Sequence, residues 1–379
     1  MKFSLILLGL MWAGGTMAQN RGVPAIAPEV LFKRLDRNGD GKLRRSEIPR
    51  PQLLPRVDKN GDQAVSLAEL KAFYEQLKGQ TQKATPRSGA FSRAADYLES
   101  KNGHSLLVYH RDQLIFEEYF NGWSEKQPHR LASGTKSFSG IMAVAAAEDG
   151  LLDLDEAVSG TITEWREDAR RSKITIRQLL TLTSGIHGGQ IGSVPDYLDA
   201  LKSADVRARP GAKFQYGPVP FQIFGEVMRR KLLPRGLSVE QYLKDRFLDP
   251  IGMRFDAWRK DSAGNVRLPS GVMITAREWA KFGLFILHHG NWEGRQIVPA
   301  QAVKKCFVGT RTNPSYGLTF WLGEKETGIT DLVMAAGAGK QKLFIIPSRE
   351  LLIVQFAEAA KTYKEAELLK RVLADVPKD

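Results

Sequence analysis

The chain has 379 residues, a formal net charge of +13, 42% hydrophobic residues and a single cysteine, Cys306. At about 150 residues per domain, this length predicts one large domain together with a smaller module, and the composition excludes collagen-like, coiled-coil and wholly disordered chains. A lone cysteine excludes an intramolecular disulfide framework, a zinc ribbon and an iron–sulfur site. The basic charge leaves nucleic acid, anionic envelope polymers and acidic membranes open as partners.

Residues 1–18 have the order of a secretory signal peptide. Lys2 is followed by an apolar run from Phe3 to Trp12 and then by small residues up to Ala18. The alternative is an N-terminal anchor, but the run is well short of the ~20 residues that span a bilayer. No cysteine stands near the cleavage region, so lipid attachment there is excluded. We expect a periplasmic or secreted protein whose mature form has no transmembrane anchor.

Two twelve-residue segments in the range 28–78 place oxygen side chains at alternate positions. They read DRNGDGKLRRSE from Asp36 and, 22 residues later, DKNGDQAVSLAE from Asp58. A calcium ion takes about seven oxygen ligands, and such a loop supplies them at positions 1, 3, 5, 7 and 12. The candidate ligands are Asp36, Asn38, Asp40, Lys42 and Glu47 in the first loop, and Asp58, Asn60, Asp62, Ala64 and Glu69 in the second.

These two segments resemble the EF-hand family, which implies a small all-α pair that binds structural Ca²⁺. The alternative is a pair of solvated Asn-Gly-Asp turns, but six of the eight acidic residues between Asn20 and Gln80 fall on ligand positions. Leu43 and Val65 occupy the apolar eighth positions and should pair. Gln63 stands where the pattern has glycine, so its backbone must tolerate strain and the second site should be weaker.

A polar stretch over residues 79–88 reads as a linker, and residues 89–379 form the large domain. Segments rich in strand residues lie at both ends of this domain, with helical stretches between them. The pattern predicts an α+β fold in which an antiparallel sheet, flanked by terminal helices, is joined to an all-helical lobe. The expected hairpins are 105–121 and 342–357; the expected helices are 137–149, 176–183, 220–231, 239–247, 276–288 and 363–374.

Ser133 and Lys136 stand at the start of the apolar helix expected over 137–149. Residues three apart share one face of a helix, so the lysine amine can reach the serine hydroxyl and activate it as a nucleophile. The helix N-terminus supplies backbone N–H groups that suit an oxyanion. Taken alone, S-x-x-K also fits an N-cap serine followed by an exposed lysine.

Further landmarks follow in order: LASGTKSF from Leu131, IRQLLTLTSGI from Ile176, RPGAKFQYG from Arg209, LDPIGM from Leu248 and a long stretch from Pro269. Together they resemble the serine β-lactamase and penicillin-binding-protein superfamily, in particular its class C β-lactamase-like branch with esterases and D-aminopeptidases. The resemblance implies Ser133 as nucleophile, Lys136 as base and Tyr216 as proton relay, although a buried core tyrosine is the alternative for Tyr216.

Two departures from the family pattern concern substrate recognition. Pro218 replaces the asparagine of the tyrosine motif, and Ala335-Ala336-Gly337 replaces the third motif, which usually begins with Lys or His. Lys340 or Lys342 could supply the missing cation. Gly337 and Ala338 would still form the edge-strand backbone that completes the oxyanion hole, with the Ala338 N–H as donor.

The sequence therefore predicts an exported serine hydrolase acting on a small ester, amide or peptide. The alternatives are a cell-wall D-Ala peptidase or β-lactamase, or a non-catalytic protein that binds an anionic cell-envelope polymer. No nucleic-acid motif is present, and no cofactor other than calcium is expected.

Overall fold

A computed structural model describes residues 28–48, 54–79, 89–359 and 361–377. The predicted signal peptide lies outside these residues, as does the predicted linker except for Gly79. The two units on either side of the linker are therefore described separately. Among the described residues, no helix is both long and apolar enough to cross a membrane.

The N-terminal unit is built from helices α2 (Pro28–Leu35), α3 (Leu54–Val57) and α4 (Leu67–Gly79). It is not entirely helical, because strands β1 (Lys42–Arg44) and β2 (Ala64–Ser66) pair antiparallel. Leu43 lies opposite Val65, as the sequence predicts, and both side chains are fully buried in the small core of this unit. This contact ties the two predicted calcium loops together.

The large domain is organised around a six-stranded antiparallel sheet with the order β10-β11-β12-β13-β3-β4. The strands are β3 (Gly103–His110), β4 (Gln113–Tyr119), β10 (Trp321–Glu324), β11 (Ile329–Gly337), β12 (Gln341–Ile346) and β13 (Leu351–Ala357). The first and last strands of the domain, β3 and β13, thus pair with each other inside the sheet. The predicted α+β class and both predicted hairpins are confirmed.

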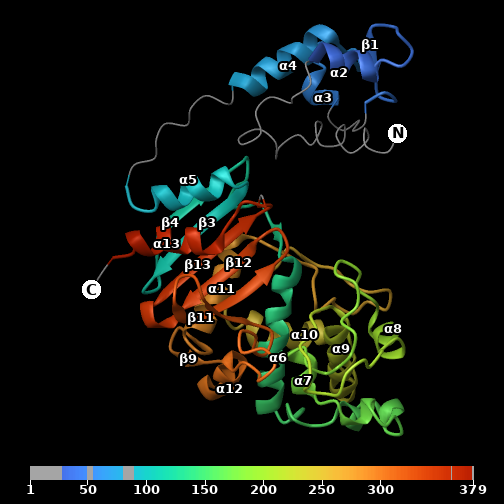
Figure 1. The fold of residues 1–379 in the computed structure, drawn as a ribbon, viewed down its shortest axis with the longest axis vertical. Coiled ribbons are helices and arrows are strands. Elements are labelled where there is room, and N and C mark those ends of the chain that lie inside the picture. The colour runs from blue at the N-terminus through green and yellow to red at the C-terminus, as the bar shows by residue number, and fades with distance from the viewer. Residues whose placement is uncertain (1–27, 49–53, 80–88, 360, 378–379) are drawn as a thin grey trace.

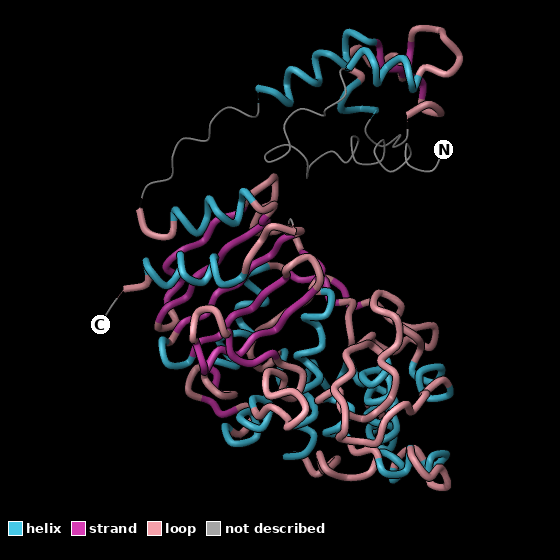
Figure 2. The backbone as a smooth tube through the Cα atoms, in the orientation of Figure 1, coloured by secondary structure: helices cyan, strands magenta, loops and turns pink. Residues whose placement is uncertain are grey.

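Helices cover both faces of this sheet (Figures 1 and 2). Terminal helices α5 (Ser92–Ser100) and α13 (Glu365–Asp375) lie on one face, over a core that includes Phe344 and Ile353. Helix α11 (Ala276–Leu287) packs on β12 and β13 from the other face, over a larger core that includes Leu343 and Val354. Alternate strand residues therefore feed two separate cores.

The helical lobe consists mainly of α7 (Ile176–Leu180), α8 (Tyr197–Lys202), α9 (Val219–Leu232) and α10 (Val239–Leu243). Helix α6 (Lys136–Glu148) runs along the junction between this lobe and the sheet, as Figure 1 shows. Its first eleven residues are all buried, which fits its nearly uniform apolar sequence. The remaining strands and α-helix of the domain are β5 (His129–Arg130), β6 (Ala257–Trp258), β7 (Val272–Ile274), β8 (Asn291–Trp292), β9 (Arg295–Gln296) and α12 (Ala300–Lys304), and short 3₁₀ and π-helical turns connect several elements.

The prediction of an edge strand at Gly337 needs correction. Strand β11 lies between β10 and β12, so it is an inner strand of the sheet. Its register with β10 begins at Met334, however, so Ala335 to Gly337 extend past the end of β10. That overhang faces the turn that carries Ser133, because β11 also contacts residues 132–135.

Candidate active site

Ser133 lies in a 3₁₀ turn, Ala132–Thr135, that leads directly into α6. The turn is fixed at its start by a hydrogen bond of 2.9 Å from the Leu131 N–H to the Val272 carbonyl. Ala132 has a φ of 47°, a left-handed conformation that costs energy for a residue with a Cβ. The serine is half-buried at the junction of the sheet and the helical lobe. The chain thus holds Ser133 on a constrained turn before a buried helix.

Lys136 is the first residue of α6, and its side chain is only 3% exposed. Its Nζ donates hydrogen bonds to Ser133 Oγ at 3.0 Å and to the Pro269 carbonyl at 2.9 Å. The aromatic rings of Tyr216 and Phe221 lie 5.0 and 5.3 Å from the same nitrogen. The Pro269 carbonyl and the two aromatic rings therefore hold the Lys136 amine in position beside the serine hydroxyl.

Burial lowers the pKa of Lys136 from 10.5 to about 7. Desolvation causes this shift, because burial removes the ammonium form from water. A neutral amine 3.0 Å from a hydroxyl can accept its proton. Near neutral pH the lysine is thus divided between its acid and base forms, which is the condition for a general base that must later return its proton.

Tyr216 lies on the loop before α9, with its ring stacked on Trp321 at 5.8 Å and edge-on to Tyr316 at 6.3 Å. Burial raises the pKa of its phenol, and a hydrogen bond with the Ser133 side chain partly opposes that rise. The structure therefore brings Ser133, Lys136 and Tyr216 into one contact group.

The backbone around Tyr216 is held by close packing of two loops. The Gln215 N–H donates to the Leu182 carbonyl at 2.8 Å, and the Val219 N–H donates to the Gly188 carbonyl at 3.0 Å. A Cβ on Gly217 would collide with the Gly188 carbonyl. Glycine at position 217 thus permits the approach that fixes the tyrosine.

Gly337 ends strand β11 beside the serine turn. A Cβ on this residue would collide with the Leu131 carbonyl, so glycine lets the strand backbone approach the turn. Ala338 follows on the exposed side of the turn between β11 and β12. The overhang of β11 therefore lies against the segment that leads into Ser133.

Neither Lys340 nor Lys342 replaces the missing third-motif cation. Both amines pair with one carboxylate oxygen of Glu365 on α13, at 3.0 and 2.9 Å respectively. Lys342 is 6% exposed and belongs to the β12 side chains that face α5 and α13, because it shares the strand face of Phe344. Ser133 lies on the other side of the sheet, so this alternative is wrong.

Comparison with known proteins identifies the family of the large domain. The family model described as Beta-lactamase matches residues 91–378, which is 288 of the 379 residues. The chain belongs to the beta-lactamase family. Its described residues also share the fold of EstCE1, "a hydrolase with promiscuous acyltransferase activity", with a TM-score of 0.61, 16% identity and coverage of 75% of this chain and 95% of that one.

Two curated relatives match over a shorter segment. Protein flp of Staphylococcus aureus (strain MW2) is 26% identical over 143 residues, which cover 35% of this chain and 28% of the relative. Monacolin J acid methylbutanoyltransferase of Aspergillus terreus (strain NIH 2624 / FGSC A1156) is 32% identical over 155 residues, which cover 33% of this chain and 37% of the relative. The matched segments thus span about a third of these relatives or less.

The structure of this beta-lactamase family member contains three contacts at the site that its sequence did not predict. The Pro269 carbonyl holds the Lys136 amine, Phe221 supplies a ring face to it, and Trp321 stacks on Tyr216. Pro269 begins one of the recognised sequence landmarks, so its position carried a signal. The sequence around Trp321 carried no such signal, because the four residues of β10 are too few to predict that this side chain stacks on Tyr216.

The N-terminal loops have the oxygen-only donors that calcium takes. Gly41 has a φ of 76°, and Gln63 adopts the same left-handed conformation at 61°, which is strained for a residue with a Cβ. The Asp36 carboxylate accepts hydrogen bonds from the Gly39 and Gly41 N–H groups, which wraps the first loop around this side chain.

The loop carboxylates are not gathered as metal ligands. Glu47 accepts hydrogen bonds from the backbone N–H groups of Arg37 and Arg44, and Asp62 pairs with the Lys42 amine at 2.7 Å. Among the described residues, no group of three acidic, His or Cys side chains is close enough to hold a metal ion. The donor chemistry fits calcium, while its binding stays a prediction.

Proposed function

We propose that the protein is an exported serine hydrolase that cleaves ester or amide bonds through an acyl-enzyme on Ser133. The observation that carries this proposal is the 3.0 Å contact between the Lys136 amine and the Ser133 hydroxyl. Burial keeps that amine partly neutral near pH 7, so it can act as a base.

In the proposed reaction, neutral Lys136 takes the hydroxyl proton as Ser133 Oγ bonds to the substrate carbonyl carbon. The carbonyl oxygen becomes an oxyanion that the N–H groups of Ser133 and Ala338 stabilise. Collapse of this intermediate breaks the bond to the leaving group, which receives a proton from Lys136 through Tyr216. A water molecule then bonds to the acyl carbon and passes one proton through Tyr216 to Lys136. As the bond from that carbon to Ser133 Oγ breaks, Lys136 returns this proton to Oγ, and the acid is released.

The recognition groups favour an ester or simple amide over a β-lactam. Pro218 offers no side-chain amide and no backbone N–H to a ligand. Lys340 and Lys342 are occupied by Glu365 on the opposite face of the sheet. A substrate carboxylate would therefore lack the cation that the family pattern places at the third motif.

The test is intact-protein mass spectrometry after exposure to a panel of p-nitrophenyl esters and to a penicillin. We expect a mass increase equal to the acyl group with the esters, absent in Ser133→Ala and present in Ser203→Ala, an exposed serine of the helical lobe. Equal labelling of wild type and Ser133→Ala would overturn the proposal, and a stable penicillin adduct with no ester turnover would favour the cell-wall peptidase alternative. Absence of turnover with every ester would favour the non-catalytic binding alternative.

For the N-terminal unit we propose a structural role in which Ca²⁺ binds through the oxygens of the two loops. Ligation would replace the present partners of Asp36, Glu47 and the corresponding residues of the second loop. The distance of these loops from Ser133 along the sequence and the shared core of Leu43 and Val65 support a contribution to stability rather than to chemistry. We also propose an anionic cell-envelope polymer as a partner, on the basis of the +13 charge.

A further inference from the structure

A hollow of about 660 Å³ lies on the helical lobe. This volume is in the range of sites for small ligands, roughly 300 to 1,000 Å³. Four of the eight side chains that line it are cations. The lining residues are Ala169, Arg170, Lys173, Gln178, Arg207, Ala208, Arg209 and Pro210.

Among the described residues, Arg207 is the only one of the four cations that forms an ion pair, although the Asp168 carboxylate also interacts with Arg170. Arg207 pairs with Asp205 at 2.6 Å, and Arg170 donates to the Val206 carbonyl at 3.1 Å. Within the described part of the chain, neither Lys173 nor Arg209 has a carboxylate within ion-pair distance, and all four cations are exposed at the surface. Guanidinium groups with free N–H donors favour phosphate and carboxylate ligands, which they can bind through two parallel hydrogen bonds.

A neutral donor complements these cations. Gln178 uses its carbonyl oxygen to accept a hydrogen bond from the Thr175 N–H at 3.0 Å. Its amide nitrogen therefore points the other way and lies near Gly211, 3.6 Å from where a Cβ on that glycine would stand. The hollow thus combines four cations with an amide N–H₂ group, a set that donates hydrogen bonds.

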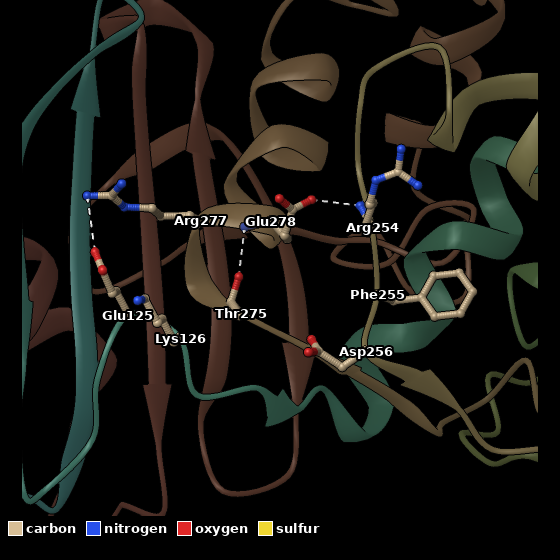
Figure 3. Close-up of a pocket in the computed structure, with 8 residues that line it drawn as sticks. All are labelled: Glu125, Lys126, Arg254, Phe255, Asp256, Thr275, Arg277 and Glu278. Carbon is tan, nitrogen blue, oxygen red and sulfur yellow. Dashed lines mark hydrogen bonds and ion pairs between the residues drawn. The ribbon is translucent and has the colours of Figure 1, made fainter.

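A second hollow, of about 360 Å³, differs from the basic hollow in the charges that line it (Figure 3). Its charges are mixed: Arg277 faces Glu125 at 3.7 Å, and the Glu278 carboxylate accepts a hydrogen bond from the Arg254 N–H at 2.6 Å. Asp256 also lines it. Charges of both signs in one small hollow give no preference for an anion.

One side of the basic hollow is formed by Arg207 to Pro210, which precede Tyr216 in the same loop. The Arg207 N–H donates to the Gly185 carbonyl at 2.8 Å, and the Gly211 N–H donates to the Thr183 carbonyl at 2.7 Å. Pro210 is six residues from Tyr216, so at most about 20 Å of chain separates them. A ligand in the hollow would therefore rest on the same loop pair that positions the tyrosine.

We propose that this hollow binds a small, multiply anionic ligand whose phosphate or carboxylate groups are held by Arg170, Lys173, Arg207 and Arg209. The site is separate from the Ser133 group, so binding does not depend on catalysis.

The experiment is isothermal titration calorimetry of the full chain with pyrophosphate and with citrate at low ionic strength. The test variant is Arg170→Gln/Arg209→Gln, and the matched control is Lys126→Gln/Arg254→Gln, which removes the same charge from the mixed hollow. We expect the test variant to lose at least about tenfold in affinity for one or both anions, since charge-assisted hydrogen bonds are lost, while the control stays within about twofold of wild type. Binding of pyrophosphate alone assigns the site to phosphates, and binding of citrate alone assigns it to carboxylates.

Two further variants keep the result interpretable. Arg170→Lys/Arg209→Lys retains the charge and should recover much of the binding, which would show that the loss is not due to misfolding. Ser133→Ala should bind as wild type does, so the fate of this site is separable from that of the proposed hydrolase activity. Equal affinities of the test and control variants, or no binding by wild type at millimolar concentrations, would overturn the proposal.

Discussion

Replacing Lys136 with methionine should change how the stability of the protein depends on pH. Burial holds the pKa of this amine near 7, against 10.5 for an exposed lysine. Below pH 7 the amine is protonated in both the folded and the unfolded chain, so the folded state bears the whole cost of burying the charge. Between pH 7 and 10.5 the folded state has lost a proton that the unfolded chain keeps, so stability rises with pH. At 1.36 kcal/mol per pKa unit, the full cost is roughly 5 kcal/mol.

The measurement is the free energy of unfolding of wild type and Lys136→Met in denaturant, at about pH 7 and about pH 9. We expect wild type to gain roughly 2 kcal/mol relative to the variant between these two pH values, because the buried amine is already half neutral at pH 7. The variant lacks the hydrogen bonds to Ser133 and Pro269 at both pH values. Their contribution to the difference in unfolding free energy therefore cancels when the two pH values are compared. The matched control is Lys126→Met, an exposed amine, which should track wild type within about 0.5 kcal/mol at both pH values. A stability difference between wild type and Lys136→Met that is the same at both pH values would refute the reasoning.

Three other results are expected. The kcat/KM for ester hydrolysis should rise with pH through a midpoint near 7 as Lys136 becomes neutral, and a flat profile from pH 5 to 9 would contradict its role as base. Gly337→Ala should lower the free energy of unfolding by about 1 to 3 kcal/mol, because a Cβ at this position collides with the Leu131 carbonyl. The melting temperature and the hydrolytic activity should therefore both fall, and an unchanged melting temperature would contradict this packing. Chelation of calcium should lower the melting temperature more than the rate of hydrolysis, and the reverse order in paired calorimetric and kinetic assays would indicate a regulatory module.

The sequence predicts the sheet and lobes because local patterns are strong in those segments. The apolar run after Lys136 becomes the buried helix α6, and the hairpin around residues 347–350 forms where Pro347 and Ser348 interrupt two runs of strand residues. The three-residue spacing of Ser133 and Lys136 likewise gives the 3.0 Å contact directly. Such contacts are local, so they follow from helix geometry alone.

Long-range contacts could not be predicted in this way. Strand β11 ends in Ala335, Ala336 and Gly337, which favour strands weakly, and it forms because β12 pairs with it. The partner of Lys342 lies 23 positions further along on α13, and only the alternation of β12 side chains decides which face that lysine occupies. The Pro269 carbonyl that holds Lys136 comes from a loop 133 residues away.

The placement of charge in the large domain has one consequence for its chemistry. The Lys340 and Lys342 amines pair with Glu365 on the far face of the sheet, while the amine beside Ser133 is held partly neutral by burial. The reacting group is therefore surrounded by the Tyr216 and Phe221 rings and a carbonyl rather than by fixed positive charge. Such a site has little to attract an anionic acyl group, whereas the basic hollow on the helical lobe does. We thus propose that anions bind on the helical lobe while Ser133 is activated at the junction of that lobe with the sheet, so salt should weaken anion binding and leave ester hydrolysis unchanged.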